Sequence, residues 1–556
     1  MSFAECRNVH NSVTSSCVIR TRVLENLNDR PLGLWLLETA QSEFGVPNFG
    51  PVEIRFGDLV RLWSSTINIT GRLGSVLVNL ETKFQGALQP PTTDTPGQEG
   101  DVYIDLSTGN VYQYVGGTWT FVRNILAPAD CFEAIVSNVL PADGVLVFTT
   151  IDDALAVDTI NTVCIREGSN SANNPFPNRN LQIKIMEGAS LNINAISTSS
   201  NIRHIEGPGT LLGRINEVNA DYFLHNLDLG LTALATGPGS INADNITITS
   251  CRDPAGILDI RPTTTQGRLR IENSKLPVVL ISKTGGTGEV HECFIQNNDM
   301  GQLRIRDMDV LRLPHICNNT IRGGGSQSGD AIQITVVNIQ GGKVHGNLIE
   351  AYNSGAAQRN IGINCNSTGL IMGFSVCDNV FFTDATSNQN PNFVLRVGAA
   401  TSSLRNVSVQ GNVMGCNYQA PYPGTSKRGQ ILMNGVDFIS GSVSNNVVNG
   451  TSQGSSIALT ITTLIETVSI VGNTLNSGDM RIEGATIDRC VFTSNETQDM
   501  LYVAATAFTK NSVSGNVVDG ALALAGTSSD DNYVSGNVNN AAPVGFTVGD
   551  VGPNRN

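Results

Sequence analysis

The sequence predicts a mainly β protein built as a solenoid, in which short strands recur along one axis. Ten asparagines each follow an apolar residue by three positions, and eight of them precede another apolar residue by two positions. Successive members lie 21, 28, 32, 33, 34, 27, 22, 21 and 21 residues apart. A repeat of this length is typical of solenoids. The ten are Asn298, Asn319, Asn347, Asn379, Asn412, Asn446, Asn473, Asn495, Asn516 and Asn537.

Each of these asparagines separates two short pieces rich in β-branched residues, as around Asn473 in Ile470–Leu475. The chain must bend there without a long loop, and asparagine tolerates the left-handed region and bonds the local backbone. We expect the amides to stack from coil to coil as a ladder. The longer apolar stripes at 3.6-residue spacing that helical repeats need are absent.

The repeat resembles the right-handed parallel β-helix proteins of the pectate-lyase and phage-tailspike type. The resemblance implies three strands per coil, with the asparagine ladder at a tight turn between two of them. The composition agrees, because 57 glycines and only 15% charged residues suit short strands and tight turns.

The net charge of -14 argues against a nucleic-acid partner, since no basic stripe is present to neutralise phosphates. The N-terminus lacks a signal-peptide pattern, and no apolar run approaches membrane-spanning length. We therefore expect folding in a cytoplasm and no membrane insertion.

Eleven cysteines without a C-x-x-C pair predict neither a zinc site nor a complete disulfide framework. Most of the cysteines, including Cys317, Cys365 and Cys377, are interpreted as small buried hydrophobes. The histidines show no metal-binding spacing, so His315 and His345 are interpreted as turn or stacking residues. The expectation is a protein with no cofactor and no metal.

Ahead of the solenoid, residues 1–88 predict an α+β module for attachment or assembly. An apolar stripe runs from Ile69 to Phe84 at helical spacing. It suits a helix that packs either on partner chains, as in a three-stranded bundle, or on its own domain. The two interpretations are equally supported.

Residues 89–127 predict a Pro/Gly linker followed by a β-hairpin. Strand-like alternation flanks Ser107–Asn110, and Gly116-Gly117 marks a second turn. The hairpin resembles a module of phage tail fibres and spikes.

Residues 128–165 are expected to form a neck and an N-terminal cap. A short amphipathic helix near Thr149–Ala156, followed by a strand from Val163, is similar to the entry of tailspike β-helices. The solenoid is expected over 166–540 and a C-terminal tail over 541–556.

Coil lengths predict where binding residues gather. Four coils are longer than the rest, and their extra residues always follow the strand after the asparagine, so the loops must share one side. The alternative is that these loops fill grooves between subunits.

If the loops bind a glycan, aromatic rings would stack on sugars, and basic or amide groups would bond hydroxyls or acids. The predicted glycan-binding residues are Tyr352, Arg359, Asn364, Arg396, Tyr418, Tyr422, Lys427 and Arg428.

The strands after these loops present one outward column, predicted as Gln333, Asn364, Arg396, Asn434 and Thr460, which holds no carboxylate. Glycoside hydrolysis needs two acids, and lyase chemistry needs a base with a cation. The nearest acids stand at loop edges, and each is more simply a turn-capping or solvated residue. As candidate catalysts they are Asp330, Glu350, Asp384 and Asp437.

The order of parts resembles a phage tailspike over nearly the whole chain. The resemblance implies a homotrimer of the virion tail, made in the host cytoplasm, whose N-terminus docks on a tail or portal-adaptor protein. Its β-helix would bind a host surface polysaccharide during adsorption. The rival is an active depolymerase of the same architecture, a glycoside hydrolase or a polysaccharide lyase, so whether the chain is an enzyme stays open.

Overall fold

The computed structural model describes residues 84–544, apart from short gaps within that span. The gaps are 88–90, 100, 106–109, 125–131, 141, 143–145, 195, 199, 232–240, 254–255, 264–266, 284–287, 324–329, 353–362, 386–394, 419–429, 451–454 and 477. Nearly all of the predicted attachment module therefore lies outside the described residues. Over the described part, no helix is long and apolar enough to cross a bilayer. The chain divides into two units, Met1–Cys131 and Phe132–Asn556.

The first unit contains a four-stranded sheet in the order β1-β2-β3-β4. Its strands are β1 (Phe84–Ala87), β2 (Val102–Asp105), β3 (Asn110–Val115) and β4 (Thr118–Asn124). β2, β3 and β4 pair antiparallel, and the turn between β3 and β4 is Gly116-Gly117, as the sequence predicts. Phe84 begins a strand, so the helical stripe predicted to end there cannot include it.

Trp119 joins the segment before the hairpin to the hairpin itself. Its ring packs edge-on against Tyr103 and Tyr114, at centroid distances of 5.5 and 5.2 Å. Its Nε1 donates to the carbonyl of Thr95 at 3.0 Å. Gly97 lies so close to the ring of Tyr114 that a Cβ there would be 2.5 Å from it. The Pro/Gly segment is thus packed on the hairpin rather than acting only as a spacer.

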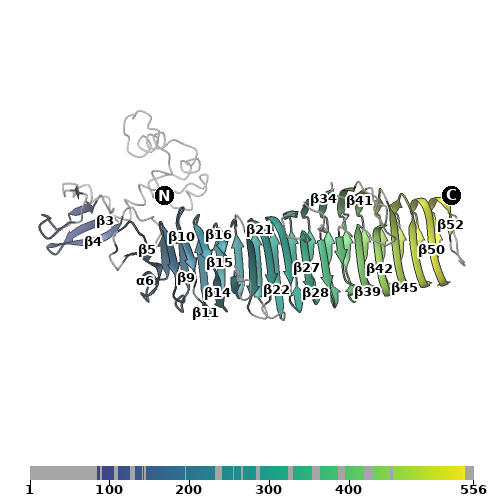
Figure 1. The fold of residues 1–556 in the computed structure, drawn as a ribbon, viewed down its shortest axis with the longest axis horizontal. Helices are drawn as coiled ribbons and strands as arrows, with labels where there is room; N and C mark the ends of the chain where they lie inside the picture. Colours follow the sequence, from purple (N-terminus) through teal and green to yellow (C-terminus); the bar gives the residue numbers. More distant parts are fainter. Residues whose placement is uncertain are drawn as a thin grey trace, which may run out of the picture. The chain divides into compact units, whose positions relative to one another are not determined.

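The second unit opens with β5 (Ala134–Val136), β6 (Val147–Phe148) and α6 (Ile151–Leu155). Thr150 caps this helix by accepting a hydrogen bond from the backbone N–H of Asp153 at 3.1 Å. Ile151, Ala154 and Leu155 are buried where the helix contacts the first strands. The predicted amphipathic helix before the solenoid is confirmed, and it covers the end of the apolar interior (Figure 1).

The rest of the unit is a long, parallel, mainly β stack, consistent with a β-helix (Figure 1). Each strand pairs in parallel with the strand one coil further along the chain. Within a coil the chain follows three faces, which we number in the order it meets them.

Face 1 begins each coil. It contains β11 (Ile196–Thr198), β14 (Ile215–Val218), β17 (Ile241–Ala243), β19 (Ile257–Pro262), β21 (Lys275–Ser282), β23 (Asp299–Arg306), β27 (Ile332–Val336), β31 (Ile363–Ser367), β35 (Leu395–Val397), β39 (Ile431–Ile439), β42 (Ser455–Glu466), β45 (Asp479–Asp488), β48 (Leu501–Thr509) and β50 (Val517–Asp530). In four coils a separate second segment follows, namely β24 (Val310–Arg312), β28 (Asn338–Gln340), β32 (Leu370–Met372) and β36 (Ser403–Arg405).

Face 2 precedes the asparagine turn. It contains β7 (Thr162–Ile165), β9 (Leu181–Ile185), β12 (Ile202–Glu206), β15 (Asp221–His225), β18 (Asn245–Thr249), β20 (Gly267–Glu272), β22 (Glu289–Gln296), β25 (Pro314–Cys317), β29 (Lys343–His345), β33 (Ser375–Cys377), β37 (Ser408–Gln410), β40 (Ser442–Ser444), β43 (Ser469–Val471), β46 (Val491–Thr493), β49 (Ser512–Ser514) and β51 (Tyr533–Ser535).

Face 3 follows the asparagine turn. It contains β8 (Ser169–Ala172), β10 (Ser190–Ile193), β13 (Thr210–Gly213), β16 (Asp228–Leu231), β26 (Thr320–Gly323), β30 (Leu348–Tyr352), β34 (Val380–Ala385), β38 (Val413–Tyr418), β41 (Val447–Gly450), β44 (Thr474–Leu475), β47 (Glu496–Thr497) and β52 (Val538–Val544). β21, β23 and β50 begin on face 3 and continue around the corner onto face 1.

The ten predicted asparagines form a continuous hydrogen-bonded ladder between faces 2 and 3. From Asn298 to Asn516, the backbone N–H and the Nδ2 of each asparagine donate to the Oδ1 of the next, at 2.8–3.1 Å. Each Nδ2 also donates back to a backbone carbonyl of the preceding coil, as Asn446 does to Val409 at 3.0 Å. All ten are buried. The ladder therefore satisfies side-chain amides that burial would otherwise leave costly.

The sequence analysis placed the left-handed conformation at the ladder asparagine, and this was wrong. In each turn the left-handed residue is the one immediately before the asparagine. That position has φ between 55° and 68° in all ten turns. The ladder asparagines are thus selected for hydrogen bonding rather than for backbone freedom. The left-handed residues are Asn297, Asn318, Gly346, Asp378, Gly411, Asn445, Gly472, Ser494, Gly515 and Gly536.

The early coils keep the same turn with other residues at the ladder position. Leu227, Cys251 and Ser274 each follow a left-handed residue. The Ser274 N–H donates to Asn298 Oδ1 at 2.9 Å, and the Cys251 N–H donates to Ser274 Oγ at 3.1 Å. The ladder therefore extends two coils beyond its first asparagine, which the sequence pattern did not reveal.

A second, shorter ladder lies at the turn between faces 1 and 2 in the last coils. The Cys490 N–H donates to Asn511 Oδ1 at 2.8 Å, and the Asn511 N–H and Nδ2 donate to Asn532 Oδ1 at 2.9 and 3.1 Å. Left-handed Arg489, Lys510 and Asp531 precede these residues. The sequence analysis missed this ladder.

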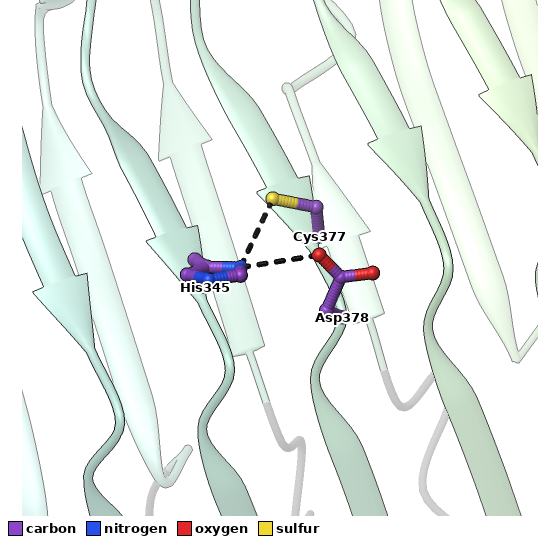
Figure 2. Close-up of side chains that lie close together, drawn as sticks. All are labelled: His345, Cys377 and Asp378. Carbon is purple, nitrogen blue, oxygen red and sulfur yellow. Dashed lines mark hydrogen bonds and ion pairs between the residues drawn. The ribbon is translucent and has the colours of Figure 1, made fainter.

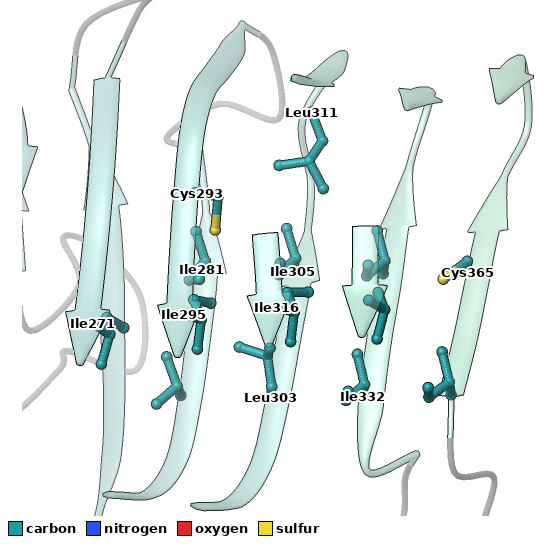
Figure 3. Close-up of a cluster of buried hydrophobic side chains, with 14 of the residues drawn as sticks. Ile271, Ile281, Cys293, Ile295, Leu303, Ile305, Leu311, Ile316, Ile332 and Cys365 are labelled. Atoms are coloured by element: carbon teal, nitrogen blue, oxygen red, sulfur yellow. The ribbon is translucent and has the colours of Figure 1, made fainter. Parts of the chain in front are cut away.

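Stacked aliphatic side chains fill the interior, with residues such as Ile271, Ile295 and Ile316 following one another from coil to coil (Figure 3). The seven cysteines whose side chains are described are all free and buried, in agreement with their interpretation as small hydrophobes. Burial raises the pKa of the Cys293 thiol to about 12, so that sulfur stays protonated.

One ion pair is buried in the early coils. Arg203 Nε donates to Glu217 Oε2 at 2.9 Å, and the hydroxyl of Tyr222 donates to the same oxygen at 2.7 Å. The guanidinium also donates to the carbonyl of Pro177 at 3.1 Å and lies over the ring of Phe176. Burial, followed by the charge of Glu217, raises the pKa of Tyr222.

Candidate functional site

The four long insertions all leave at the corner between faces 3 and 1. β30 ends at Tyr352 and β31 begins at Ile363, and the other three loops connect β26 to β27, β34 to β35 and β38 to β39. Their shared side is as predicted. The loop residues Arg359, Tyr422, Lys427 and Arg428 lie outside the described residues. For Tyr352, Asp384 and Tyr418 the structure describes the backbone, which is part of β30, β34 and β38 respectively. Asp384 is in register with Tyr352.

Two predicted site residues meet at the base of this corner. The Asn364 Nδ2 donates to Asp330 Oδ2 at 2.7 Å, across adjacent coils. The Nε2 of Gln302, one coil earlier, donates to the backbone carbonyl of Asp330 at 2.7 Å. Asp330 is only 5% exposed. Its carboxylate is thus held in a built polar site.

Burial raises the pKa of Asp330 to about 6, although the Asn364 hydrogen bond and the charges of Arg304 and Arg396 oppose this rise. Burial also lowers the pKa of both guanidinium groups, which nevertheless stay charged. Arg396 Nε donates to the carbonyl of Gly398 at 3.0 Å. The result is a buried acid that titrates near neutrality within reach of two cations.

The outer surface of β31 offers hydrogen-bond acceptors. Over the described residues, the Oδ1 atoms of Asn364 and Asn366 are buried and accept no hydrogen bond. These residues alternate along one strand, so their side chains lie on the same side. Buried acceptors without partners are costly, and a bound hydroxyl group is one way to satisfy them.

The other candidate acids do not join Asp330. Glu350 lies on face 3, where Arg322 contacts it at 3.4 Å and also bonds Asp299 at 2.6 Å. Asp437 lies on the second half of β39, where its Oδ2 accepts from Ser403 Oγ at 3.5 Å. Asp384 is on β34, on face 3. Glu350 and Asp384 therefore share face 3, whereas Asp437 stands on β39 of face 1.

The predicted outward column was wrong in register beyond Arg396. Arg304, Gln333, Asn364 and Arg396 are aligned, but Arg396 pairs with Leu432 rather than with Asn434. Asn434 and Thr460 lie two residues further along, in the row of Glu483. The long loop before β39 concealed this offset in the sequence. The corrected row, which we call the face 1 row, continues through Leu432, Ala458, Arg481 and Tyr502.

A shallow groove of about 650 Å³ opens where the face 1 row reaches the later coils. Its lining includes small residues such as Gly484, Ala504 and Ala525, together with Thr460 and Tyr502. Small lining residues on neighbouring long strands leave room for an elongated ligand. The sequence analysis had not singled out this part of the chain.

Charged and aromatic side chains are arranged along this groove. The Arg481 guanidinium lies 4.7 Å from the ring centroid of Tyr502, and its Nε is 3.4 Å from Glu483 Oε1. Stacked Arg and Tyr side chains present both a flat surface and hydrogen-bond donors. The alternation Asp479-Met480-Arg481-Ile482-Glu483 was a sequence signal for these outward residues.

Two carboxylates lie in adjacent coils where the chain enters face 1, Asp479 at the start of β45 and Asp499 just before β48. The pKa of Asp479 is raised, first by burial and then by the charge of Asp499. Asp479 Oδ1 accepts from the N–H of Met500, and Asp499 Oδ2 accepts from the N–H of Gly478. The carboxylates thus brace two successive corners of the chain.

Among the described residues, one group combines histidine, cysteine and aspartate ligand atoms within 4.8 Å of one another. It consists of His345, Cys377 and Asp378, on and beside face 2 (Figure 2). The sequence had predicted no metal site, because these residues come from two coils 32 residues apart. The group lies on a different face from the face 1 row.

No protein-family model matches the chain, and no solved structure matches it significantly. Among curated proteins, a collagen-like protein 1 of Acanthamoeba polyphaga mimivirus is 62% identical over 29 residues. That stretch is 5% of this chain and 3% of the viral protein, so the chain spans a very small part of its relative. The similarity is too short to show a family.

Proposed function

We propose that the chain is a receptor-binding structural protein of the phage-tailspike type, which binds a host surface polysaccharide along face 1 of a right-handed β-helix. The observation that carries the proposal is the face 1 row. It runs from Arg304 through Asn364 and Arg396 to Arg481 and Tyr502. A row that repeats about every 4.8 Å suits a long, hydroxyl-rich chain better than a compact ligand.

The chemistry of the row supports a glycan. Arg304 and Arg396 provide positive charge, and Asn364 and Asn366 provide buried acceptors for hydroxyl groups. Tyr502 offers a ring for stacking on a sugar, in a groove that is open to solvent. The cations favour an acidic polysaccharide over a neutral one.

The attachment role is proposed from the order of parts. The described hairpin precedes a capped parallel stack, which is the order expected for a spike joined to a virion tail through its N-terminus. A homotrimer is part of the same proposal. Val491, Val517, Tyr533 and Val538 in the last coils are 39–56% exposed, and another copy of this chain would cover such a surface.

An active depolymerase is the second candidate, and the paired Asp479 and Asp499 favour it. The pKa of Asp479 is raised, first by burial and then by the charge of Asp499, as a general acid requires. Asp330 is a weaker candidate, since the charged groups that act on it are two arginines rather than a second carboxylate.

The proposal is tested by binding full-length protein to an array of bacterial capsular and O-antigen polysaccharides. One acidic polysaccharide should retain the protein, and Tyr502→Ala should weaken that binding at least about tenfold. Phe223→Ala is the matched control, because this 39% exposed ring lies on face 2 and its loss should leave binding unchanged. If Tyr502→Ala binds the polysaccharide as well as Phe223→Ala does, the glycan does not bind at Tyr502. The double variant Tyr418→Ala/Tyr422→Ala then tests the loop side.

Cleavage is measured on the retained polysaccharide, as new reducing ends or unsaturated uronate absorbance. Binding without product supports the structural role. Product that disappears in Asp479→Asn or Asp499→Asn, with folding and binding intact, supports the depolymerase. If only Asp330→Asn abolishes product, the catalytic acid is Asp330 rather than Asp479 or Asp499.

A further inference from the structure

His345, Cys377 and Asp378 bring three different ligand atoms together on the outside of face 2. The His345 Nδ1 lies 3.5 Å from Cys377 Sγ and 3.2 Å from Asp378 Oδ2 (Figure 2). His345 ends β29, and Cys377 ends β33 in direct register with it. Asp378 follows in the turn. The group therefore bridges two successive coils.

The turn itself does not require an acid at position 378. Asp378 is the left-handed residue before Asn379, and the equivalent residues in the other ladder turns are asparagine, glycine or serine. Asn318 and Asn445 occupy this position two coils before and two coils after it. Asp378 is thus the one carboxylate in the ten turns, and it stands where a histidine and a cysteine adjoin it.

The next coil leaves space above this carboxylate. A Cβ on Gly411 would lie 2.3 Å from Asp378 Oδ1, so glycine at 411 allows the side chain to keep its position. The Asp378 side chain is 61% exposed and that of His345 is 36% exposed, whereas Cys377 is buried. A cation would therefore enter from solvent and meet the sulfur last.

We infer that His345 Nδ1, Cys377 Sγ and an Asp378 carboxylate oxygen form a binding site for Zn²⁺ or a similar borderline-soft divalent cation. An imidazole nitrogen, a thiolate and a carboxylate are the ligand types that zinc uses, and three protein ligands leave the fourth tetrahedral position to water. The three atoms already lie within 4.8 Å of one another, so coordination requires only small side-chain shifts.

Binding is accompanied by the loss of one proton. An ordinary cysteine thiol carries its proton at neutral pH when no cation is bound. Coordination replaces the S–H bond by a metal–sulfur bond, and the proton passes to solvent. Ser375 Oγ lies 3.9 Å from the sulfur. The positive charge of Lys343 acts on the same sulfur, so it repels a cation and lowers the affinity of the site.

Cys317 lies one coil earlier in the same register row as His345. Its Sγ is not among the three clustered atoms, so it is not assigned as a ligand. A bound cation would tie β29 to β33 at the start of the coils that carry the longest loops. Its expected effect is local stabilisation of these coils rather than catalysis.

The test titrates full-length protein with Co²⁺, whose absorption reports both tetrahedral geometry and thiolate ligation, and then with Zn²⁺ as competitor. Wild type should give a thiolate-to-cobalt band at one equivalent, and Zn²⁺ should abolish it. Cys377→Ser should remove the band, and Asp378→Asn and His345→Gln should each weaken binding at least about tenfold. Asp378→Asn should preserve folding, since asparagine occupies the same position in the turns two coils before and two coils after.

His315→Gln is the matched control. His315 lies on the same outer face, stacked on Phe294 at 4.9 Å, and its replacement should leave cobalt binding unchanged. A wild-type protein without the thiolate band would overturn the inference. Equal affinity in Asp378→Asn and wild type would also overturn it, because the Asp378 carboxylate would then not be a ligand.

Discussion

The side-chain amide of Asn364 donates to the carboxylate of Asp330 at 2.7 Å, joining residues 34 positions apart in the sequence. This bond holds a buried acid at the corner where the long loops leave, beside the arginines of the face 1 row. It also shows how polar sites form in the solenoid, since side chains from successive coils can contact each other although they are far apart in the sequence. Any function of the acid depends on its protonation, which can be tested directly.

Asp330→Asn should change how stability depends on pH. The pKa of Asp330 is raised from 3.8 to about 6, so the folded state binds this proton more tightly than the unfolded state. Its stabilising contribution is complete below about pH 4 and is lost as the pH rises through 6. Relative to wild type, the variant should therefore gain up to about 3 kcal/mol between pH 4 and pH 7. Denaturant unfolding at both pH values measures this, and parallel curves would show that Asp330 is not the titrating group.

Asn446→Val should destabilise the solenoid through hydrogen bonds rather than through backbone strain. The Oδ1 of Asn446 accepts from the N–H and the Nδ2 of Asn412, at 3.1 and 2.9 Å. Valine leaves the Asn412 N–H buried without this acceptor, and the Nδ2 keeps only its bonds to backbone carbonyls such as that of Val376. We expect a loss of about 1–3 kcal/mol, or misassembly. Asn449→Val, on the half-buried outer side of β41, is the control for asparagine loss. Unchanged thermal stability of Asn446→Val would contradict the energetic role of the ladder.

Glu217→Gln should cost about 3–5 kcal/mol, because it removes the negative partner of a buried guanidinium at Arg203. The double variant Arg203→Met/Glu217→Leu should recover much of this loss, since no buried charge then remains. Asp228→Asn, which breaks an exposed pair with Arg252, should change stability little. Chemical denaturation of the three proteins is the measurement, and equal effects of the two single variants would refute the argument from burial.

Gly411→Ala should destabilise more than Gly515→Ala. Both glycines are left-handed, with φ of 66° and 63°, so both variants incur the same backbone cost of about 1–2 kcal/mol. Only at Gly411 does the new Cβ meet another atom closely, 2.3 Å from Asp378 Oδ1, whereas at Gly515 the Cβ would lie 3.9 Å from Thr493 Oγ1. The difference between their unfolding midpoints isolates the contact. Asp378→Gly in the Gly411→Ala background should abolish that difference.

Sedimentation should show a trimer. The exposed apolar residues of the last coils would be covered by other copies of this chain. The variant Tyr533→Asp, at a 56% exposed position, should shift the protein toward smaller species. A stable wild-type monomer at micromolar concentration would remove the oligomer from the proposal.

The repeat could be predicted because it is local. An apolar residue three positions before an asparagine identifies a turn without knowledge of distant coils, so the ladder and the shared side of the loops were correct. The amphipathic helix ending at Leu155 and the Gly116-Gly117 turn were local signals as well. Their caps and spacing lie within a few residues of one another.

The remaining features depend on register between coils, which variable loop lengths conceal. Arg396 is aligned with Leu432 because β39 begins at Ile431. The long segment before it, which includes residues 419–429, hides this starting point in the sequence. Likewise His345 and Cys377 meet only because one whole coil separates them. The left-handed position was misassigned by one residue, because asparagine is favourable both in left-handed turns and in hydrogen-bonded ladders.

The asparagine ladder also has a direction. Each asparagine donates to the Oδ1 of the asparagine in the following coil, so the most recently formed coil always presents donors that only the next coil can satisfy. A chain that leaves the ribosome N-terminus first supplies these acceptors in the order in which they are needed. The rod can thus lengthen one layer at a time during synthesis, with each completed coil serving as the template for its successor.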